Sequence, residues 1–278
     1  AVFVLTWLIV RDGWSTRGLT ALGASAALMG MVREQDLFFA LGPALDCGWT
    51  LMQRVRGTGV NQASWQKLST NAIAGVVTFC ACYLPQLVSY VILYGRPAPS
   101  PLVERKMNWL APHAWQVLAS PEHGFLLWTP MAGLALAGLV VLARQAGDGG
   151  REVTTRRIAL ILLVMVASQV YISGSVESWS AAGTFGQRRF VALTVPLTVG
   201  LAVLFQAAHG SKMRSILTAT VLLCIWWNVG LMAQFGSGMM DRQRLELSKN
   251  TYNTFVVVPL SLPNLVYRYL FQRQSFYE

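Results

Sequence analysis

A series of long, almost uncharged apolar runs is the feature that most limits what this chain can fold into. Of its 278 residues, 54% are hydrophobic and 12% are charged, whereas about 25% of the residues in a soluble domain are charged. A helix crosses a bilayer with about 20 mainly apolar residues, and the alternating pattern of a transmembrane barrel is missing. The runs predict an all-α, polytopic transmembrane helical bundle of about seven to eight spans. The spans are expected over residues 18–32, 37–52, 71–94, 124–143, 157–176, 190–208 and 214–234.

Both ends of the chain differ from this pattern. Residues 1–10 are apolar but too few to cross about 30 Å of hydrocarbon, so we expect them to be the tail of a helix that starts outside this sequence. Residues 1–234 are predicted to form the transmembrane domain, without its N-terminal part. Residues 235–278 form a tail in which Pro259 interrupts an apolar run. An extracytoplasmic, interfacial or re-entrant tail is therefore favoured over a further span.

The distribution of lysine and arginine predicts the orientation of the bundle. If the spans alternate, the loops on one side carry eleven of the 22 cations, and the loops on the other side carry the same number over about twice the length. The positive-inside rule places the denser set in the cytoplasm. The net charge of +10 suggests contact with anionic lipid, and no module for binding nucleic acid accompanies it. The denser set comprises residues 11–17, 53–70, 144–157 and 209–214.

Motifs of soluble enzymes and metal sites are missing from the sequence. The four cysteines lie in apolar runs and read as small buried side chains. With three histidines we expect no metal site, and in the absence of a nucleotide-binding motif we expect no cofactor. Asp46 is a charge well inside a predicted span; it reads as a residue near the cytoplasmic end of a bent helix, or as a transporter residue.

Charged residues between the second and third runs form the first candidate site. Arg33, Glu34 and Asp36 fall within four residues. They form either a hairpin turn whose charges pair with one another or a polar lining for a cavity at the membrane surface.

The loop at residues 95–123 holds two further candidates. Glu104 precedes Arg105 and Lys106, and Trp109 and Trp115 follow. The segment reads either as a carboxylate beside cations that bind a phosphate or as a solvated interfacial helix, because indole rings favour the headgroup region.

Glu122 and His123 directly precede an apolar run. A histidine here can titrate near neutral pH and act as an acid, a base or a phosphate ligand. Alternatively, the segment is only a helix start, with Ser120 as N-cap and Pro121 at the first helical position.

Arg188 and Arg189 stand at the start of another apolar run, after Gly183 and Gly186. Cations at a helix N-terminus oppose the helix dipole, so helix stability does not explain them. They read either as ligands of a phosphate or pyrophosphate or as anchors in the membrane interface.

Several of these segments together resemble a known superfamily. The chain is similar, over roughly residues 33–205, to the C-terminal part of bacterial polytopic membrane proteins related to the GT-C glycosyltransferases, which include protein mannosyltransferases and lipid-linked aminoarabinose transferases. The residues that carry the resemblance are Phe79, Tyr83, Leu84, Pro85, Gln86, Tyr90, Leu93, Tyr94 and Gly95, then Ser120-Pro121-Glu122-His123-Gly124-Phe125-Leu126-Leu127-Trp128-Thr129-Pro130, then Trp179, Gly183-Thr184-Phe185-Gly186-Gln187-Arg188-Arg189-Phe190 and Pro196.

The resemblance implies a multi-pass protein of the bacterial inner membrane whose active site faces the extracytoplasmic side. It implies a polyprenyl-phosphate-linked sugar as donor, with Arg188, Arg189 and His123 near the phosphate leaving group. GT-C enzymes place a catalytic acidic residue in the first extracytoplasmic loop, and this chain begins in a later helix, so the catalytic residue stays unassigned. The rival hypothesis is a non-catalytic accessory subunit of a larger membrane complex, because many small residues permit close helix packing.

Overall fold

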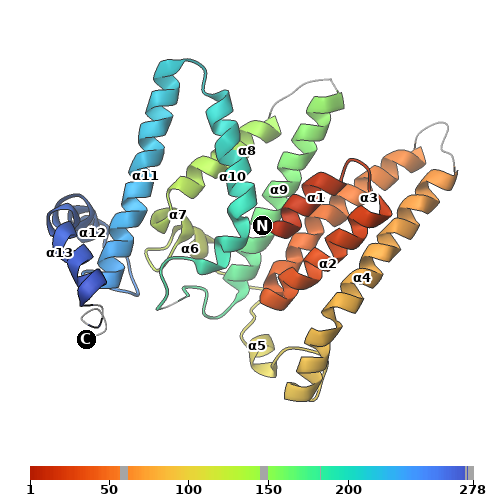
Figure 1. Ribbon diagram of the computed structural model, residues 1–278, viewed down its shortest axis with the longest axis horizontal. Helices are drawn as coiled ribbons and strands as arrows, with labels where there is room; N and C mark the ends of the chain where they lie inside the picture. The colour runs from red at the N-terminus through yellow and green to blue at the C-terminus, as the bar shows by residue number, and fades with distance from the viewer. Residues whose placement is uncertain (57–61, 145–149, 182, 273, 275–278) are drawn as a thin grey trace. The chain divides into compact units, whose positions relative to one another are not determined.

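The computed structural model describes residues 1–56, 62–144, 150–181, 183–272 and 274, and only the backbone of residues 62–64, 103, 104 and 150–153. In this part of the chain the regular elements are helices, which confirms the all-α prediction (Figure 1). They are α1 (Val2–Val10), α2 (Thr16–Val32), the 3-10 helix η1 (Glu34–Ala40), α3 (Leu41–Arg56), α4 (Gln62–Tyr94), α5 (Pro101–Arg105), α6 (Ala114–Ala119), α7 (Phe125–Trp128), α8 (Met131–Arg144), α9 (Gly150–Ser175), the 3-10 helix η2 (Arg188–Leu193), α10 (Thr194–Ala207), α11 (Ser211–Ser237), α12 (Leu247–Tyr252), the π-helix η3 (Asn253–Val257) and α13 (Val258–Phe271).

Five helical segments of the described chain are long and apolar enough to cross a membrane. The molecule is therefore a multi-pass membrane protein. The number of these segments is lower than the seven to eight spans that the sequence predicted. The C-terminal tail also supplies one of the five segments, although we favoured an interfacial run there. The segments are Trp65–Tyr94, Thr154–Ser175, Arg188–Ala207, Ser211–Ser237 and Leu247–Phe271.

The predicted span over residues 124–143 is broken by a proline. α7 ends at Trp128, its C-cap Thr129 has a non-helical backbone (φ −134°), and α8 starts after Pro130. A proline disfavours the helical conformation of the residue before it. The break leaves α8 as a short apolar helix and places α7 among the loops rather than in the bundle.

The chain folds into two compact units, each built from separated stretches of sequence. Unit 1 comprises Ala1–Trp109, Leu142–Ile172 and Ala192–Pro196, and unit 2 comprises Leu110–Val141, Ser173–Val191 and Leu197–Glu278.

In unit 1, α2 packs against α4 through glycines. A Cβ on Gly23 would overlap the carbonyl of Gly75, so the two backbones touch at this point. One end of this contact is closed by hydrogen bonds, because Thr16 donates to Asn71 Oδ1 (2.7 Å) and Asn71 donates to the carbonyl of Trp14 (2.9 Å). Small residues allow this close approach between membrane helices.

A buried ion cluster joins α1, α3 and α9 in unit 1. Asp46 is fully buried. Its carboxylate accepts from Arg11 Nε (2.8 Å) and Trp7 Nε1 (3.0 Å) and pairs with Arg157 Nε (2.8 Å). Pairing of this kind compensates the cost of burying a carboxylate. The cluster therefore gives Asp46 a structural role, where the sequence left a bend or a transported ion as alternatives.

Unit 2 contains a hairpin of α10 and α11, joined at residues 208–210 (Figure 1). α8 contacts α10 by backbone, since a Cβ on Gly138 would overlap the carbonyl of Gly200. α11 binds the C-terminal helices through Gln234, which donates to Thr254 Oγ1 (2.8 Å) and accepts from Asn250 (2.9 Å). All three side chains are buried and hydrogen-bonded, so the network specifies how α12 and η3 dock on α11.

Candidate functional site

Three loops of unit 2 meet around one turn, Ser120–Gly124. The amide of Leu245 and the indole N–H of Trp128 both donate to the carbonyl of Pro121 (3.0 and 3.2 Å). Phe185, from the loop at residues 177–189, packs its ring edge against Trp128, with centroids 5.4 Å apart. The structure thus brings together the two segments highlighted in the sequence, residues 120–130 and 177–189, and adds a third, residues 238–246. We call this arrangement the loop cluster.

His123 lies at the centre of the loop cluster and is fully buried. Its ring stacks on Trp128 with 4.7 Å between centroids, and its φ of +63° is in the left-handed region. Neither ring nitrogen makes a hydrogen bond of normal geometry with the described residues. Burial lowers the pKa of His123, while the backbone carbonyls of Arg242 and Thr184 and the nearby carboxylates of Glu122 and Asp241 oppose the shift. The ring is therefore held neutral inside the cluster.

The turn before α7 is not the helix cap that the sequence offered as an alternative. Ser120 Oγ accepts from the amide of Glu122 (3.0 Å), and Gly124 donates to the carbonyl of Ser120 (2.7 Å). The helix starts only at Phe125, with Gly124 as its N-cap. The serine closes a tight turn, and the turn places Glu122 at the surface and His123 in the interior.

α11 holds the loop cluster through hydrogen bonds to the end of α7. Trp227 donates its indole N–H to the carbonyl of Leu127 (3.1 Å), and Asn228 donates to the carbonyl of Trp128. These bonds satisfy carbonyls at the end of α7, where a short helix leaves its acceptors free. Trp128 also packs with Leu231 of α11 in a small apolar core. The position of α7 therefore depends on a helix about 100 residues later in the chain.

The two arginines at the end of the loop at residues 177–189 have different surroundings. Arg189 donates to the carbonyl of Ser178 (2.9 Å) and to its hydroxyl (3.1 Å), and it also reaches the carbonyl of Trp179 (3.3 Å). It ties its own loop together. Arg188 is exposed at the start of η2, so of the two it is the one available to a ligand.

The remaining predicted residues belong to unit 1, where Arg33 and Asp36 lie in one turn. Arg33 donates to Gln35 Oε1 (3.0 Å) and lies 3.9 Å from Asp36. Burial raises the pKa of Asp36, and the charge of Arg33 opposes this rise. This pairing agrees with the hairpin turn that the sequence offered as one reading. Arg105 is exposed at the end of α5, and the side chain of Glu104 lies outside the described residues.

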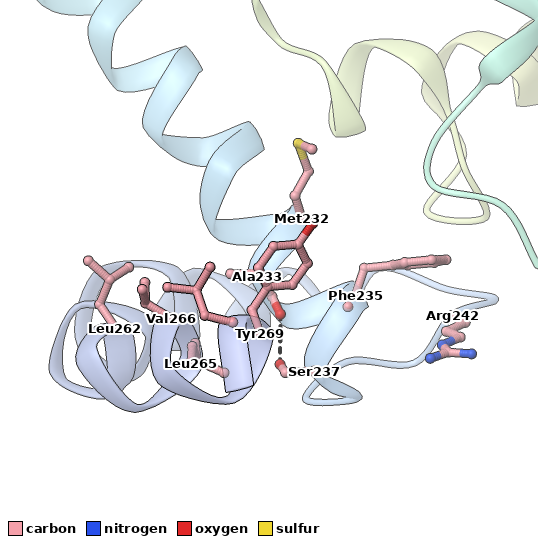
Figure 2. A pocket seen from close by; sticks show the side chains of 11 residues that line it. Met232, Ala233, Phe235, Ser237, Arg242, Leu262, Leu265, Val266 and Tyr269 are labelled. Carbon is pink, nitrogen blue, oxygen red and sulfur yellow. Dashed lines mark hydrogen bonds between the residues drawn. The ribbon is translucent and has the colours of Figure 1, made fainter. Parts of the chain in front are cut away.

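A groove in unit 2 was not foreseen from the sequence. It has a volume of about 600 Å³ and is lined mainly by apolar side chains of α11 and α13. Figure 2 shows Leu262 and Val266 of α13 on one side, and Phe235 and Arg242 together at the other end. The guanidinium of Arg242 lies 5.5 Å from the ring centroid of Phe235, which fits a cation–π contact. The sequence signal was a pair of exposed arginines, Arg242 and Arg244, between two apolar runs, which is too common to be specific.

Among the side chains that the structure describes, no three of His, Cys, Asp and Glu converge as metal ligands would. No protein-family model, no curated protein and no solved structure matches this chain.

Proposed function

We propose that this chain is a GT-C-like membrane glycosyltransferase, or the lipid-binding part of one, that takes a polyprenyl-phosphate-linked sugar as donor at the extracytoplasmic face. The observation that carries the proposal is the apolar groove that ends at Arg242. A polyprenyl phosphate has matching chemistry, with a long hydrocarbon chain next to an anionic headgroup. The resemblance of the loop segments to GT-C proteins supports the same ligand.

In this proposal Arg242 binds the phosphate. A guanidinium forms strong charge-assisted hydrogen bonds with phosphate oxygens, and it stabilises the charge that develops on a phosphate leaving group. The contact with Phe235 orients the side chain of Arg242. Arg188 is a second candidate cation. His123 and Arg189 position the loops, because the first is buried and the second is bonded to its own loop.

Binding of a polyprenyl phosphate tests this proposal, with the corresponding polyprenol as a ligand that lacks the phosphate. The protein is placed in nanodiscs, and both affinities are measured for the wild type and for Arg242→Gln. The variant should bind the phosphate about tenfold more weakly, because it loses a charge-assisted hydrogen bond. Its affinity for the polyprenol should not change. Arg244→Gln is the matched control, since Arg244 is also exposed and does not line the groove.

A bulky residue in the groove gives an independent readout. Val266→Trp should weaken binding of the phosphate and of the polyprenol alike, because it fills the apolar part. If Arg242→Gln and Val266→Trp both bind the phosphate as the wild type does, the groove is not the donor site and the proposal fails.

An accessory subunit of a larger membrane complex is the second candidate. It is favoured by α4, where only 6% of the most apolar 18-residue window of this span is buried. A helix so little covered by its own chain suits a partner as well as lipid. Extraction in mild detergent separates the two candidates: co-purification at a constant ratio with a larger assembly supports the subunit, and a protein that runs alone contradicts it.

A further inference from the structure

A second cavity, in unit 1, lies between α2 and α4 on one side and η1 and α3 on the other. Its volume is about 540 Å³, within the range of roughly 300–1,000 Å³ that small-molecule sites occupy. None of the described side chains that line it is charged, and small residues such as Gly23, Ala44 and Gly48 make up much of its wall. Ala44 and Gly48 are exposed, so the cavity opens toward the surroundings of the bundle.

The walls of this cavity are held apart by the packing of unit 1. On one side the backbone contact between Gly23 and Gly75 joins α2 to α4. On the other side the ion cluster of Asp46 holds α3. These contacts fix α2 against α4, and α3 against Arg11 and Arg157, with the cavity between the two pairs of elements.

Trp14 places an unused hydrogen-bond donor at one end of the cavity. The side chain lines the cavity and is 1% exposed, yet its indole N–H has no partner among the described residues. A buried donor without an acceptor costs free energy. A ligand that places an ester carbonyl or a phosphate oxygen here would satisfy it.

Three cations lie near the ends of α2, α3 and α4 that are closest to Trp14. The hydrogen bond between Thr16 and Asn71 sets the register of α2 and α4, so Arg17 and Lys67 lie near that end. Arg54 stands in the last turn of α3, beyond the cavity residue Leu51. All three belong to segments that the positive-inside rule assigns to the cytoplasmic face. Their charge complements an anionic headgroup.

We infer that this cavity binds one acyl chain of an anionic phospholipid, with Trp14 donating to the ester or phosphate and the cations around the headgroup. The site belongs to unit 1 and does not depend on the proposed function. A hydrocarbon chain fits because the cavity is apolar, and a headgroup fits because donor and cations are at one end only.

Native mass spectrometry of the detergent-solubilised chain, supplemented with phosphatidylglycerol or phosphatidylcholine, tests the inference. The wild type should retain one phosphatidylglycerol and prefer it over phosphatidylcholine. Gly48→Leu should reduce this occupancy at least tenfold, because the new side chain enters the cavity. A Cβ at Gly48 meets no atom within 4 Å, so the variant leaves the protein's own packing intact. Gly13→Leu is the matched control, since a Cβ there is equally free and Gly13 does not line the cavity.

Two further variants test the polar end. Trp14→Phe keeps an aromatic ring and removes the donor, so phosphatidylglycerol occupancy should fall several-fold. Replacing Arg54 and Lys67 by glutamine should abolish the preference for the anionic lipid and leave phosphatidylcholine binding unchanged. The inference is overturned if Gly48→Leu retains phosphatidylglycerol like the wild type, if the two lipids bind equally well, or if a polyprenyl phosphate or a protein segment is the occupant recovered.

Discussion

Arg11 and Asp46 lie 35 residues apart and form a bidentate pair, with Arg11 Nε and Nη2 at 2.8 and 3.2 Å from the two carboxylate oxygens. The pair is buried on both sides. Arg157 approaches the same carboxylate from α9, so one acidic residue pairs with two arginines from separate parts of the chain.

Replacing this carboxylate should therefore destabilise the protein strongly. Asp46→Asn removes the buried carboxylate that Arg11 and Arg157 share, and breaking a buried pair costs about 3–5 kcal/mol. We expect a large fall in the midpoint of thermal unfolding in detergent. Asp12→Asn is the control, because Asp12 also pairs with Arg11 (3.4 Å) but its side chain is 84% exposed. Equal midpoints for the two variants would contradict a structural role for Asp46.

Two glycines of α8 should respond differently to the same substitution. Gly138→Ala forces a methyl group into the carbonyl of Gly200, and overpacking of this kind costs about 1–3 kcal/mol. Gly133→Ala adds a methyl group 3.9 Å from its nearest neighbour, Leu126. It should be neutral or slightly stabilising, because alanine favours the helix. Unfolding in denaturant measures both. If Gly138→Ala is as stable to denaturant as Gly133→Ala, the close packing of α8 on α10 is contradicted.

The stability of the loop cluster should depend on pH through His123. Its folded pKa lies below the ordinary value of 6.5 because the ring is buried. The unfolded chain therefore binds a proton first, so this stability is complete above pH 6.5 and is lost as the pH falls toward the folded pKa. We expect His123→Asn to reduce the fall in thermal midpoint below pH 6.5. Asparagine suits the test because it tolerates a positive φ. An unchanged pH dependence would show that His123 is not responsible.

The hydrogen bonds of Arg189 should determine how readily a protease cleaves its loop. Arg189→Gln removes contacts to Ser178 and Trp179, and we expect cleavage by chymotrypsin after Trp179 to accelerate roughly three- to tenfold. Arg188→Gln should leave the rate unchanged, since Arg188 is exposed. The assignment of the two arginines would be reversed if only Arg188→Gln accelerated cleavage.

The sequence predicted the local features of this protein well. The long apolar helices follow from composition, and four of the five segments overlap predicted spans. The exception, Leu247–Phe271, contains two prolines that argued against a further span. Pro259 and Pro263 are accommodated, the former near the start of α13 where its missing N–H matters least. The sequence also singled out residues 120–130 and 177–189, which the structure joins.

Contacts between distant residues were not predictable in the same way. The groove that Arg242 lines depends on α13 docking against α11, and the partners of Asp46 come from α1 and α9. His123 looked like a titrating residue at the surface, and the structure buries it because three loops close over one turn.

The sequence by itself determined that this is a helical, multi-pass membrane protein, because helix hydrogen bonds are local and the apolar length of a segment decides whether it can enter a bilayer. Only the tertiary structure decided which polar residues bond to other parts of the protein and which remain available to a ligand. Arg189 and Asp46 find partners inside the protein, while Arg242 and Trp14 line cavities. That distinction depends on distances between segments far apart in the chain, and such distances are set by packing and not by local pattern.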